Sequence, residues 1–198
     1  MRRKSEIRQE VLNKRNRLRL EEIEIKSEQV GINLFSLKEF EQAETVLFYV
    51  AKGSEVATLP MIESVIGLKR VFVPISVRRR RKLVYSEIYS IDELEPGAYG
   101  ILRPRRDSRR ILPLEQLASE AGIVIVPGVV FDEKGFRTGY GAGFYDRFLT
   151  AFRYHHASTA LFIALAFELQ IVEDTFPEKH DVPVDMIITE RRIINCRR

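Results

Sequence analysis

Three alternating glycines, Gly139, Gly141 and Gly143, follow a run of β-branched residues and lead into a helical pattern. A loop without Cβ atoms can bring several backbone N–H groups close to an anion, and the N-terminus of the next helix adds the positive end of its dipole. The loop therefore suits a phosphate, although such glycines are also common in ordinary turns. Its spacing matches neither the G-x-G-x-x-G dinucleotide fingerprint nor a Walker A loop, which needs a closing Gly-Lys-Ser/Thr.

Charged residues flank these glycines. Arg137 precedes them and Arg147 follows them, so guanidinium groups are available to neutralise a phosphate. Asp146 stands at the start of the helix, where a carboxylate repels a phosphate unless a cation bridges the two. Mg²⁺ is the usual bridge, held by one or two carboxylates and by phosphate oxygens. A carboxylate here also favours the helix dipole, so the spacing alone leaves both interpretations open.

The segment that contains the glycines resembles the signature of 5-formyltetrahydrofolate cyclo-ligases, also called methenyltetrahydrofolate synthetases. It reads Pro-Gly-Val-Val-Phe-Asp over 127–132, then Gly135, Arg137 and Gly-Tyr-Gly-Ala-Gly-Phe-Tyr-Asp-Arg-Phe-Leu over 139–149. Four further blocks resemble the family in the same order. They are Lys4 with Arg8, Tyr49–Thr58 with Gly53 and Glu55, Tyr99–Pro104, and His180–Glu190. Five blocks in order are specific, and the resemblance extends over almost the whole chain.

The resemblance implies an enzyme that uses ATP and Mg²⁺ to convert 5-formyltetrahydrofolate to 5,10-methenyltetrahydrofolate, releasing ADP and phosphate. In that reaction ATP phosphorylates the formyl oxygen, and N10 of the substrate attacks the activated carbon. The nucleophile belongs to the substrate, so the protein has to supply positioning and charge neutralisation. This agrees with the residues present, because no Ser-His-Asp set is evident and the single cysteine, Cys196, lies in the C-terminal tail.

The resemblance also implies a set of site residues. The implied catalytic residues are Arg137, Tyr145 and Asp146. The implied ATP-binding residues are Lys4, Arg8, Arg137, Thr138, Gly139, Tyr140, Gly141, Ala142, Gly143, Phe144 and Tyr145. The implied substrate-binding residues are Val50, Glu55, Tyr140, Gly141, Ala142, Gly143 and Phe144. The implied metal ligands are Asp146 and Asp185.

Each of these residues also has a purely structural interpretation. Lys4 and Arg8 lie four positions apart and suit a solvated helix face, while Val50 suits the core. Glu55 suits the first turn of a helix, and Asp185 suits a turn beside a strand.

Four positions depart from the pattern expected of the family. Ala142 stands where relatives carry lysine or glycine, and Phe144 replaces a tyrosine. Arg103 stands where an acidic or polar residue is more usual, and Ile75 where a basic residue is common. These departures leave the nucleotide half of the expected site intact and change the folate half.

The elements that must position these residues alternate between helices and strands. We expect one or two helices over 3–30, stopped by Gly31, and further helices over 58–68, 114–121 and 145–154. We expect strands over 45–50, 70–75, 82–89, 123–126, 159–167 and 185–189, and a turn-rich loop over 95–104. Pro74 is expected to end the second strand or to place it at an edge.

This alternation predicts an α/β fold, a Rossmann-like three-layer sandwich with a largely parallel central sheet and an N-terminal helical arm. The chain has 198 residues, of which 45% are apolar, and this is enough for a continuous core. No internal repeat or break in composition divides it. We therefore expect residues 1–198 to form a single domain.

The formal net charge of +4 is too modest to imply a nucleic-acid partner. Basic residues nevertheless gather in the first twenty positions, in 78–82, in 103–110 and at the C-terminus. They suit either solvated faces or anions such as nucleotide phosphates, the polyglutamate tail of a folate, or RNA. RNA binding ranks below an enzyme because the basic runs lack interleaved aromatic residues. The other alternative is an ATP-dependent paralog that acts on a different formyl or amide compound.

The sequence has no pattern typical of export or membrane insertion. No apolar stretch follows the basic N-terminus, and the two most apolar stretches, 122–131 and 159–167, fall short of the roughly 20 residues that a membrane helix needs. One cysteine cannot form an internal disulfide. We expect a soluble, cytoplasmic monomer or weak homodimer that binds 5-formyltetrahydrofolate, including polyglutamylated forms, and neither nucleic acid nor membrane.

Overall fold

The computed structural model describes residues 3–77, 79, 82–97, 100–155, 158–178 and 181–196. Its helices are α1 (Lys4–Arg15), α2 (Leu20–Phe35), α3 (Lys38–Gln42), α4 (Leu59–Val65), α5 (Leu114–Glu120) and α6 (Phe144–Arg153), with 3-10 helices η2 (Ile91–Glu93), η4 (Arg106–Ser108) and η5 (Glu168–Gln170). Its strands are β1 (Thr45–Leu47), β2 (Arg70–Val77), β3 (Lys82–Ile88), β4 (Leu94–Pro96), β5 (Leu102–Pro104), β6 (Arg110–Ile111), β7 (Ile123–Val126), β8 (Val130–Asp132), β9 (Arg137–Thr138), β10 (Leu161–Leu165), β11 (Ile171–Val172), β12 (Met186–Ile188) and β13 (Ile193–Asn195).

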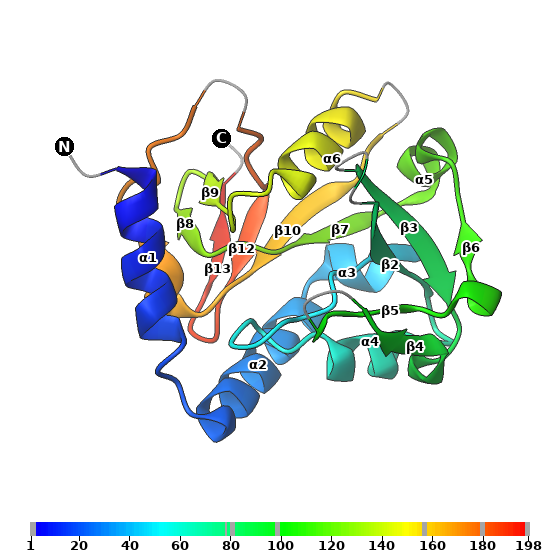
Figure 1. The fold of residues 1–198 in the computed structure, drawn as a ribbon, viewed down its shortest axis with the longest axis horizontal. Coiled ribbons are helices and arrows are strands. Elements are labelled where there is room, and N and C mark those ends of the chain that lie inside the picture. Colours follow the sequence, from blue (N-terminus) through cyan, green and yellow to red (C-terminus); the bar gives the residue numbers. More distant parts are fainter. Residues whose placement is uncertain are drawn as a thin grey trace.

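Within the described ranges, eight strands form the main sheet in the order β13-β12-β10-β7-β1-β2-β3-β6 (Figure 1). The five strands from β12 to β2 run parallel to one another. Antiparallel strands extend both edges, β13 beside β12, and β3 followed by β6 beside β2. The carboxyl ends of β7, β1 and β2 therefore meet at one edge, which is where open α/β sheets bind their ligands.

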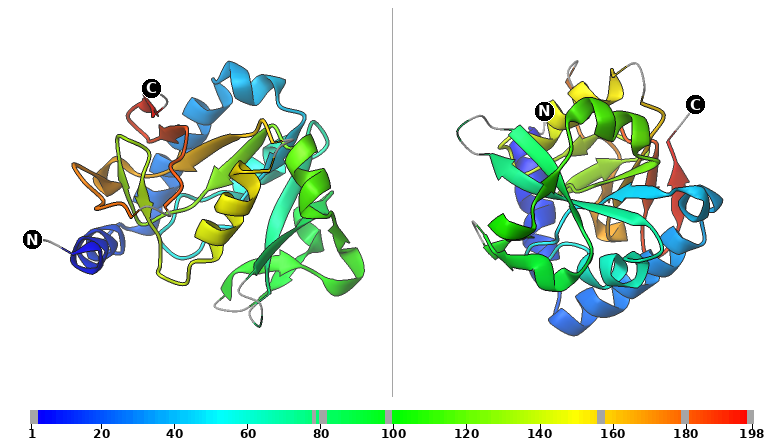
Figure 2. Two further views of the ribbon diagram at one scale, coloured as in Figure 1. Left: turned by 90° about the horizontal axis from the view of Figure 1, so that it is seen from above. Right: turned by 90° about the vertical axis from the view of Figure 1, so that its right-hand side faces the viewer.

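Helices cover both faces of this sheet. In β7, Ile123 and Ile125 pack in a cluster with α2, α3 and α4, whereas Val124 and Val126 pack in a second cluster with α5 and α6. This alternation follows from the two-residue period of a strand whose two faces are both buried. Figure 2 shows the two groups of helices on opposite sides of the strands. The predicted three-layer sandwich with a largely parallel sheet is confirmed.

Helix α1 lies outside these layers, at one end of the molecule beside β8 (Figure 1). Ile7 and Val11 on its buried side form a small apolar cluster with Val129 and Val130. The segment expected to hold one or two helices therefore holds two, and the first forms the predicted arm. The arm is anchored at β8, close to the chain that leads into the glycine-rich loop.

The prediction that Gly31 ends the first helical segment is wrong, because α2 continues through it to Phe35. Gly31 is buried, and a Cβ atom added to it would approach the Met61 side chain to 3.4 Å. The glycine thus allows close packing of α2 on α4. The 95–104 stretch is not a plain loop either, since β4 and β5 pair within it as an antiparallel hairpin.

Pro74 neither ends β2 nor places that strand at the edge of the sheet. It pairs with Tyr85 in β3. The parallel pairing of β2 with β1 stops at Phe72, so at Pro74 only one neighbouring strand remains. A residue without an N–H group is tolerated where one side of the strand is unpaired.

A second sheet of three strands, ordered β11-β8-β9, was not predicted. Its central strand β8 is parallel to β11 and antiparallel to β9. The pairing of Phe131 with Arg137 fixes the start of the glycine-rich loop against the main body. Over the part of the chain that the structure describes, no helix has the length and apolar character needed to span a membrane.

Candidate active site

A cavity of about 440 Å³ opens where β1, β7 and β2 end. Its lining includes Val50, which follows β1, and Gly128, which follows β7. The sequence-predicted site residues that line it are Val50, Glu55, Arg137, Gly139, Tyr140, Gly141, Ala142, Gly143, Phe144, Tyr145 and Asp146. Thr138 is buried in β9 at the foot of the loop. The structure thus gathers most of the predicted residues around one space.

Two of the glycines are required by the shape of the loop. Gly141 has a φ of 93° and Gly143 a φ of 66°, both in the left-handed region that favours glycine. Gly143 is the N-cap of α6, so the chain turns there directly into the helix. Because Gly143 and Phe144 line the cavity, the positive end of the helix dipole borders it. The loop therefore has the features that the sequence predicted for an anion site.

Arg137 is the clearest sign that a ligand is expected. Only 2% of its side chain is exposed, and Nη1 donates to Asp146 Oδ1 at 2.9 Å. Its Nε and Nη2 atoms are buried and have no hydrogen-bond partner among the described residues. Burial lowers the pKa of Arg137, and Asp146 and Asp181 oppose that effect. A buried donor without an acceptor is costly, so a bound phosphate would complete this site.

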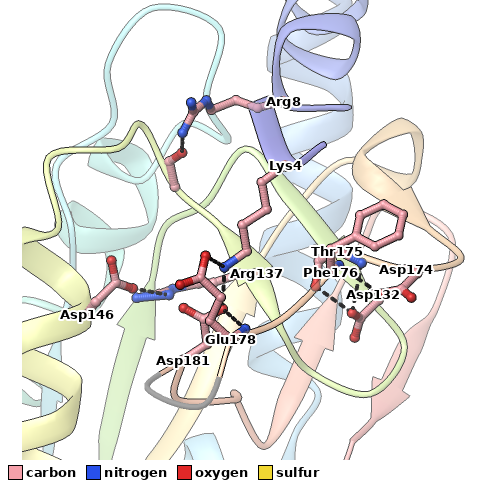
Figure 3. A network of polar contacts seen from close by, with 11 residues as sticks. Lys4, Arg8, Asp132, Arg137, Asp146, Asp174, Thr175, Phe176, Glu178 and Asp181 are labelled. Atoms are coloured by element: carbon pink, nitrogen blue, oxygen red, sulfur yellow. Dashed lines mark hydrogen bonds and ion pairs between the residues drawn. The ribbon is translucent and has the colours of Figure 1, made fainter. Parts of the chain in front are cut away.

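Cations and carboxylates alternate beside the loop (Figure 3). Arg137 pairs with Asp146, and Lys4 Nζ contacts Asp181 Oδ2 at 2.5 Å and Glu178 Oε1 at 3.5 Å. Asp181 also acts electrostatically on Arg137, which places the two pairs next to each other. Two cations from distant parts of the chain therefore face three carboxylates at the entrance of the loop.

Arg8, the second basic residue of α1 in the prediction, lies over the loop. Its Nη1 donates to the carbonyl oxygen of Gly139 at 3.4 Å. A Cβ atom added to Gly141 would approach Arg8 Nη1 to 3.2 Å, so the guanidinium group sits directly on the glycines. Neither Lys4 nor Arg8 lines the cavity itself. Both residues lie beside the loop, outside the cavity.

Asp185 does not lie at this entrance or among the described residues that line the cavity. Its Oδ2 accepts hydrogen bonds from the Phe162 backbone N–H at 2.7 Å and from Arg153 Nη2 at 2.9 Å, which places it between β10 and α6. Asp181, four positions earlier, is the aspartate that approaches the loop, and the sequence analysis missed it. Both belong to one conspicuous block, and spacing alone does not distinguish them.

Chemistry of a different kind lies at the far end of the cavity. Glu55 is buried, and its Oε2 accepts a hydrogen bond from the Lys52 backbone N–H at 2.8 Å. Burial raises the pKa of Glu55. Arg15 is also buried, and its Nη2 donates to the Tyr140 hydroxyl at 2.5 Å. Sequence reasoning missed Arg15. The signal that could have found it is its spacing, because Arg15 lies four positions after Val11 and eight after Ile7, on the apolar side of the same helix.

Tyr145 lies between the two ends of the cavity and packs against both apolar clusters. Burial raises the pKa of its phenol well above the ordinary value, and nearby Tyr85 adds to the effect. A phenol with a raised pKa stays protonated at neutral pH. Tyr145 can therefore donate a hydrogen bond to a bound group, but it is a poor general base.

The four residues that depart from the pattern expected of the family also lie at the cavity. Ile75, Arg103, Ala142 and Phe144 all line it. Arg103 pairs with Glu95 at 3.1 Å, and in the same basic run Arg110 pairs with Glu93 at 2.8 Å. Much of the charge of this run is thus neutralised within the chain. Arg78, Arg80, Arg81, Tyr99 and His180, which belong to the expected basic run and family blocks, lie outside the described residues.

The described residues contain no group of three or more His, Cys, Asp and Glu side chains that could hold a metal ion. A divalent cation held by Asp146 or Asp181 would therefore take its other ligands from phosphate oxygens and water. This is the usual arrangement for Mg²⁺, which retains several waters and binds through one or two carboxylates.

Comparison with known proteins points to one family. A family model described as the 5-formyltetrahydrofolate cyclo-ligase family matches residues 1–190. The 5-formyltetrahydrofolate cyclo-ligase of Escherichia coli (strain K12) is 28% identical over 185 residues, which covers 92% of this chain and 98% of that protein. The enzyme of the same name from Haemophilus influenzae is 30% identical over 151 residues, covering 75% of this chain and 77% of that protein.

Solved structures agree with the sequence relatives. The 5,10-methenyltetrahydrofolate synthetase of Aquifex aeolicus matches with a TM-score of 0.83 and 31% identity, over 98% of this chain and 93% of that chain. The 5,10-methenyltetrahydrofolate synthetase of Mycoplasma pneumoniae matches with a TM-score of 0.74 over 96% of this chain and 99% of that chain. Its identity is 18%, so it shows the shared fold alone.

Proposed function

The chain belongs to the 5-formyltetrahydrofolate cyclo-ligase family, and we propose that it closes 5-formyltetrahydrofolate to 5,10-methenyltetrahydrofolate in the cavity beside the glycine-rich loop, using ATP and Mg²⁺. The observation that supports this placement is Arg137, a buried guanidinium group with two nitrogen atoms that have no hydrogen-bond partner in the part of the chain that the structure describes. A phosphate of ATP supplies the acceptors that these donors need.

The reaction needs an activated formyl group. The formyl oxygen takes the terminal phosphoryl group of ATP and ADP leaves, after which N10 of the substrate attacks the formyl carbon and phosphate departs with that oxygen. No atom of the protein enters the product. The task of the protein is therefore to hold the two substrates in line and to neutralise the negative charge of the transferred phosphoryl group. This agrees with a cavity whose described lining offers arginine, tyrosine and backbone N–H groups.

The nucleotide end uses cations from two segments, β9 and α1. Arg137 in β9 provides the buried donors, and Lys4 and Arg8 approach from α1. The backbone of 139–143 and the N-terminus of α6 provide N–H groups with a favourable dipole. Two of these cations are paired with carboxylates of the chain, Arg137 with Asp146 and Lys4 with Asp181. Binding of ATP therefore exchanges partners and does not bring new charges out of solvent.

Asp146 and Asp181 are the residues that would hold Mg²⁺, and the bound ion would neutralise phosphate charge during transfer. They fit because both lie at the entrance of the loop and both already face a cation there. With both carboxylates bound to the ion, Arg137 and Lys4 would be available to phosphate. Asp185 is left out of this proposal because Arg153 and the Phe162 backbone hold its carboxylate elsewhere.

The folate end is assigned to Val50, Glu55 and Tyr140, with the backbone of the loop closing over the ring. Reduced pterins carry N–H donors on one edge, and a buried carboxylate such as Glu55 is a strong acceptor for them. Phe144 offers an apolar surface in place of a hydroxyl.

We also propose that the chain acts as one catalytic unit. The residues assigned to the two ends of the cavity come from α1, from the segments after β1 and β7, from β9 and the loop after it, and from α6.

Incubation of the purified protein with 5-formyltetrahydrofolate, ATP and Mg²⁺ tests this proposal. The methenyl product absorbs in the near ultraviolet, and its appearance is expected to require both ATP and Mg²⁺ and to match ADP release one to one. A matched reaction with EDTA is the control. Absence of product with all three components, or product formed equally without ATP, contradicts the proposal.

A further inference from the structure

Arg15 is among the largest side chains in the molecule that are almost completely buried, with 1% of the residue exposed. It stands at the end of α1, on the same side as Ile7 and Val11. A buried arginine loses its hydration, so its donors must be matched by acceptors of the chain. The identity of these acceptors indicates what Arg15 does.

Each part of the guanidinium group reaches a different segment around the cavity. Nε donates to Ser54 Oγ at 3.1 Å, Nη1 to the Gly128 carbonyl oxygen at 3.3 Å, and Nη2 to the Tyr140 hydroxyl at 2.5 Å. Ser54 precedes Glu55, Gly128 follows β7, and Tyr140 belongs to the glycine-rich loop. One side chain therefore ties together the three segments that form this end of the cavity.

Among the described residues, none of the hydrogen-bond partners of Arg15 carries a charge. Glu55 is the carboxylate on which it acts at longer range. Burial raises the pKa of Glu55, while the charge of Arg15 and a hydrogen bond from the Tyr140 hydroxyl lower it. Five other titratable groups interact electrostatically with Glu55. They come from α1, from the turn after β1, from the glycine-rich loop and from α6, and they are Arg15, Tyr49, Lys52, Tyr140 and Tyr145.

We propose that Arg15 is a positioning residue for the folate ring: its three hydrogen bonds hold Tyr140, Gly128 and the turn at Ser54 and Glu55 in one arrangement around the ring. The inference rests on the proposed function and names the residue that organises the ring end of the same site. Arg15 does not touch the reacting atoms. Its role is to hold Tyr140 and the turn at Glu55 in place for the N–H edge of the ring, and its charge also lowers the pKa of Glu55.

Removing the charge of Arg15 is expected to shift the pH dependence of kcat/KM, which a loss of packing alone would not do. Without Arg15, Glu55 keeps its proton to a higher pH, so the acidic limb of kcat/KM for the folate moves to higher pH. The KM for the folate rises about tenfold or more, because the ring is held less well. The KM for ATP changes little, since Arg137, Lys4 and Arg8 are untouched.

The experiment compares Arg15→Met with wild type in the methenyl absorbance assay, from acidic to neutral pH, with each substrate varied in turn. Lys14→Met is the matched control, since it removes an exposed cation from the same helix, where Lys14 pairs with Glu10. The shifted acidic limb and the selective rise in the folate KM are expected for Arg15→Met and not for Lys14→Met. If Arg15→Met does not fold, Arg15→Gln removes the charge and keeps hydrogen-bonding atoms.

Arg15→Lys separates charge from geometry. It is expected to keep the acidic limb at the wild-type pH and still to raise the folate KM, because an ammonium group cannot reach all three acceptors. An uncharged variant whose acidic limb coincides with wild type, or whose two KM values rise equally, overturns the inference. A wild-type protein that forms no methenyl product instead overturns the proposed function, so the two failures are distinct.

Discussion

The two ends of the cavity are completed in different ways. At the ring end, Arg15 finds an acceptor for each of its nitrogen atoms within the chain. At the phosphate end, Arg137 is equally buried but has one partner and two unmatched nitrogen atoms. A phosphate brings many acceptors and negative charge, whereas a pterin ring brings few. At the phosphate end the ligand can therefore supply the acceptors that Arg137 needs, whereas at the ring end the chain itself supplies the acceptors for Arg15.

The difference predicts opposite effects on stability and activity at the two ends. A buried donor without an acceptor destabilises the unliganded protein, so residues at the phosphate end should be dispensable for folding and essential for turnover. Residues at the ring end belong to a connected network and should matter for both.

The largest effect is expected for Arg137→Met, which breaks the phosphate end. The loss in kcat/KM for ATP should be about 10²-fold or more, as for other removed groups that stabilise developing charge. The free energy of unfolding without nucleotide should stay within about 1 kcal/mol of wild type or rise, because an apolar side chain replaces unmatched donors. Steady-state kinetics and urea denaturation measure the two effects. Wild-type turnover at saturating ATP would remove Arg137 from the site.

The second prediction separates the two aspartates of the C-terminal block. Asp181→Asn should raise the Mg²⁺ concentration for half-maximal activity by about tenfold or more, equivalent to at least about 1.4 kcal/mol in ion binding. Asp185→Asn should leave that concentration unchanged and lower the free energy of unfolding by about 1–3 kcal/mol, through its charged hydrogen bonds. Mg²⁺ titrations of activity, with thermal unfolding of both variants, decide between them. Reversed behaviour would restore Asp185 as the ligand.

The third prediction concerns the cost of the buried charge at the ring end. Burial raises the pKa of Glu55 in the folded protein, so the unfolded chain loses this proton first as pH rises above 4.5. Folding stability therefore falls through the window between that value and the raised one. Glu55→Gln has no proton to lose, so it should be more stable than wild type at neutral pH but not below 4.5, while its folate KM rises.

Urea denaturation of both proteins over a series of pH values gives the stability difference directly. Other titrating groups are common to both proteins and cancel in this difference. A difference that stays constant with pH would show that Glu55 is ionised alike in the folded and unfolded states.

The smallest effect is expected at the basic run that borders the cavity. Arg103 already pairs with Glu95 near the surface, so little of its charge is left for a polyglutamate tail. Arg103→Ala should weaken the binding of a polyglutamylated folate by about 0.2–1 kcal/mol at low salt and less at physiological salt. Isothermal titration with mono- and polyglutamylated substrates measures this. Equal affinities for both substrates in the wild-type protein would exclude a role for the run.

The features predicted well from the sequence were contiguous ones. The glycines, Arg137 and Asp146 lie within ten residues, and their chemistry follows from local order along the chain. The strands of the parallel core were also found, since a buried strand is a short apolar run in any context. Residue type and spacing were sufficient to predict that these residues lie together, because their arrangement is local.

The missed features depend on contacts that no spacing contains. Arg15 and Tyr140 are separated by 125 positions, and Lys4 and Asp181 by 177. Pro74 was misplaced because its tolerance depends on where the pairing of β1 stops. Gly31 was misread because only the packing of α2 on α4 shows that a small residue is needed inside a helix. In each case tertiary structure overrides a sound local preference.

Helix α1 meets its partners at the site across most of the length of the chain: Lys4 contacts Asp181, 177 positions away, and Arg8 contacts Gly139, 131 positions away. Contacts between segments so far apart form slowly, because a long segment of chain has to close first. We therefore expect α1 to dock on β8 after the parallel sheet has folded. A molecule with a folded sheet and an undocked arm would lack two of the cations proposed to bind ATP, and would be unable to hydrolyse nucleotide without forming the methenyl compound.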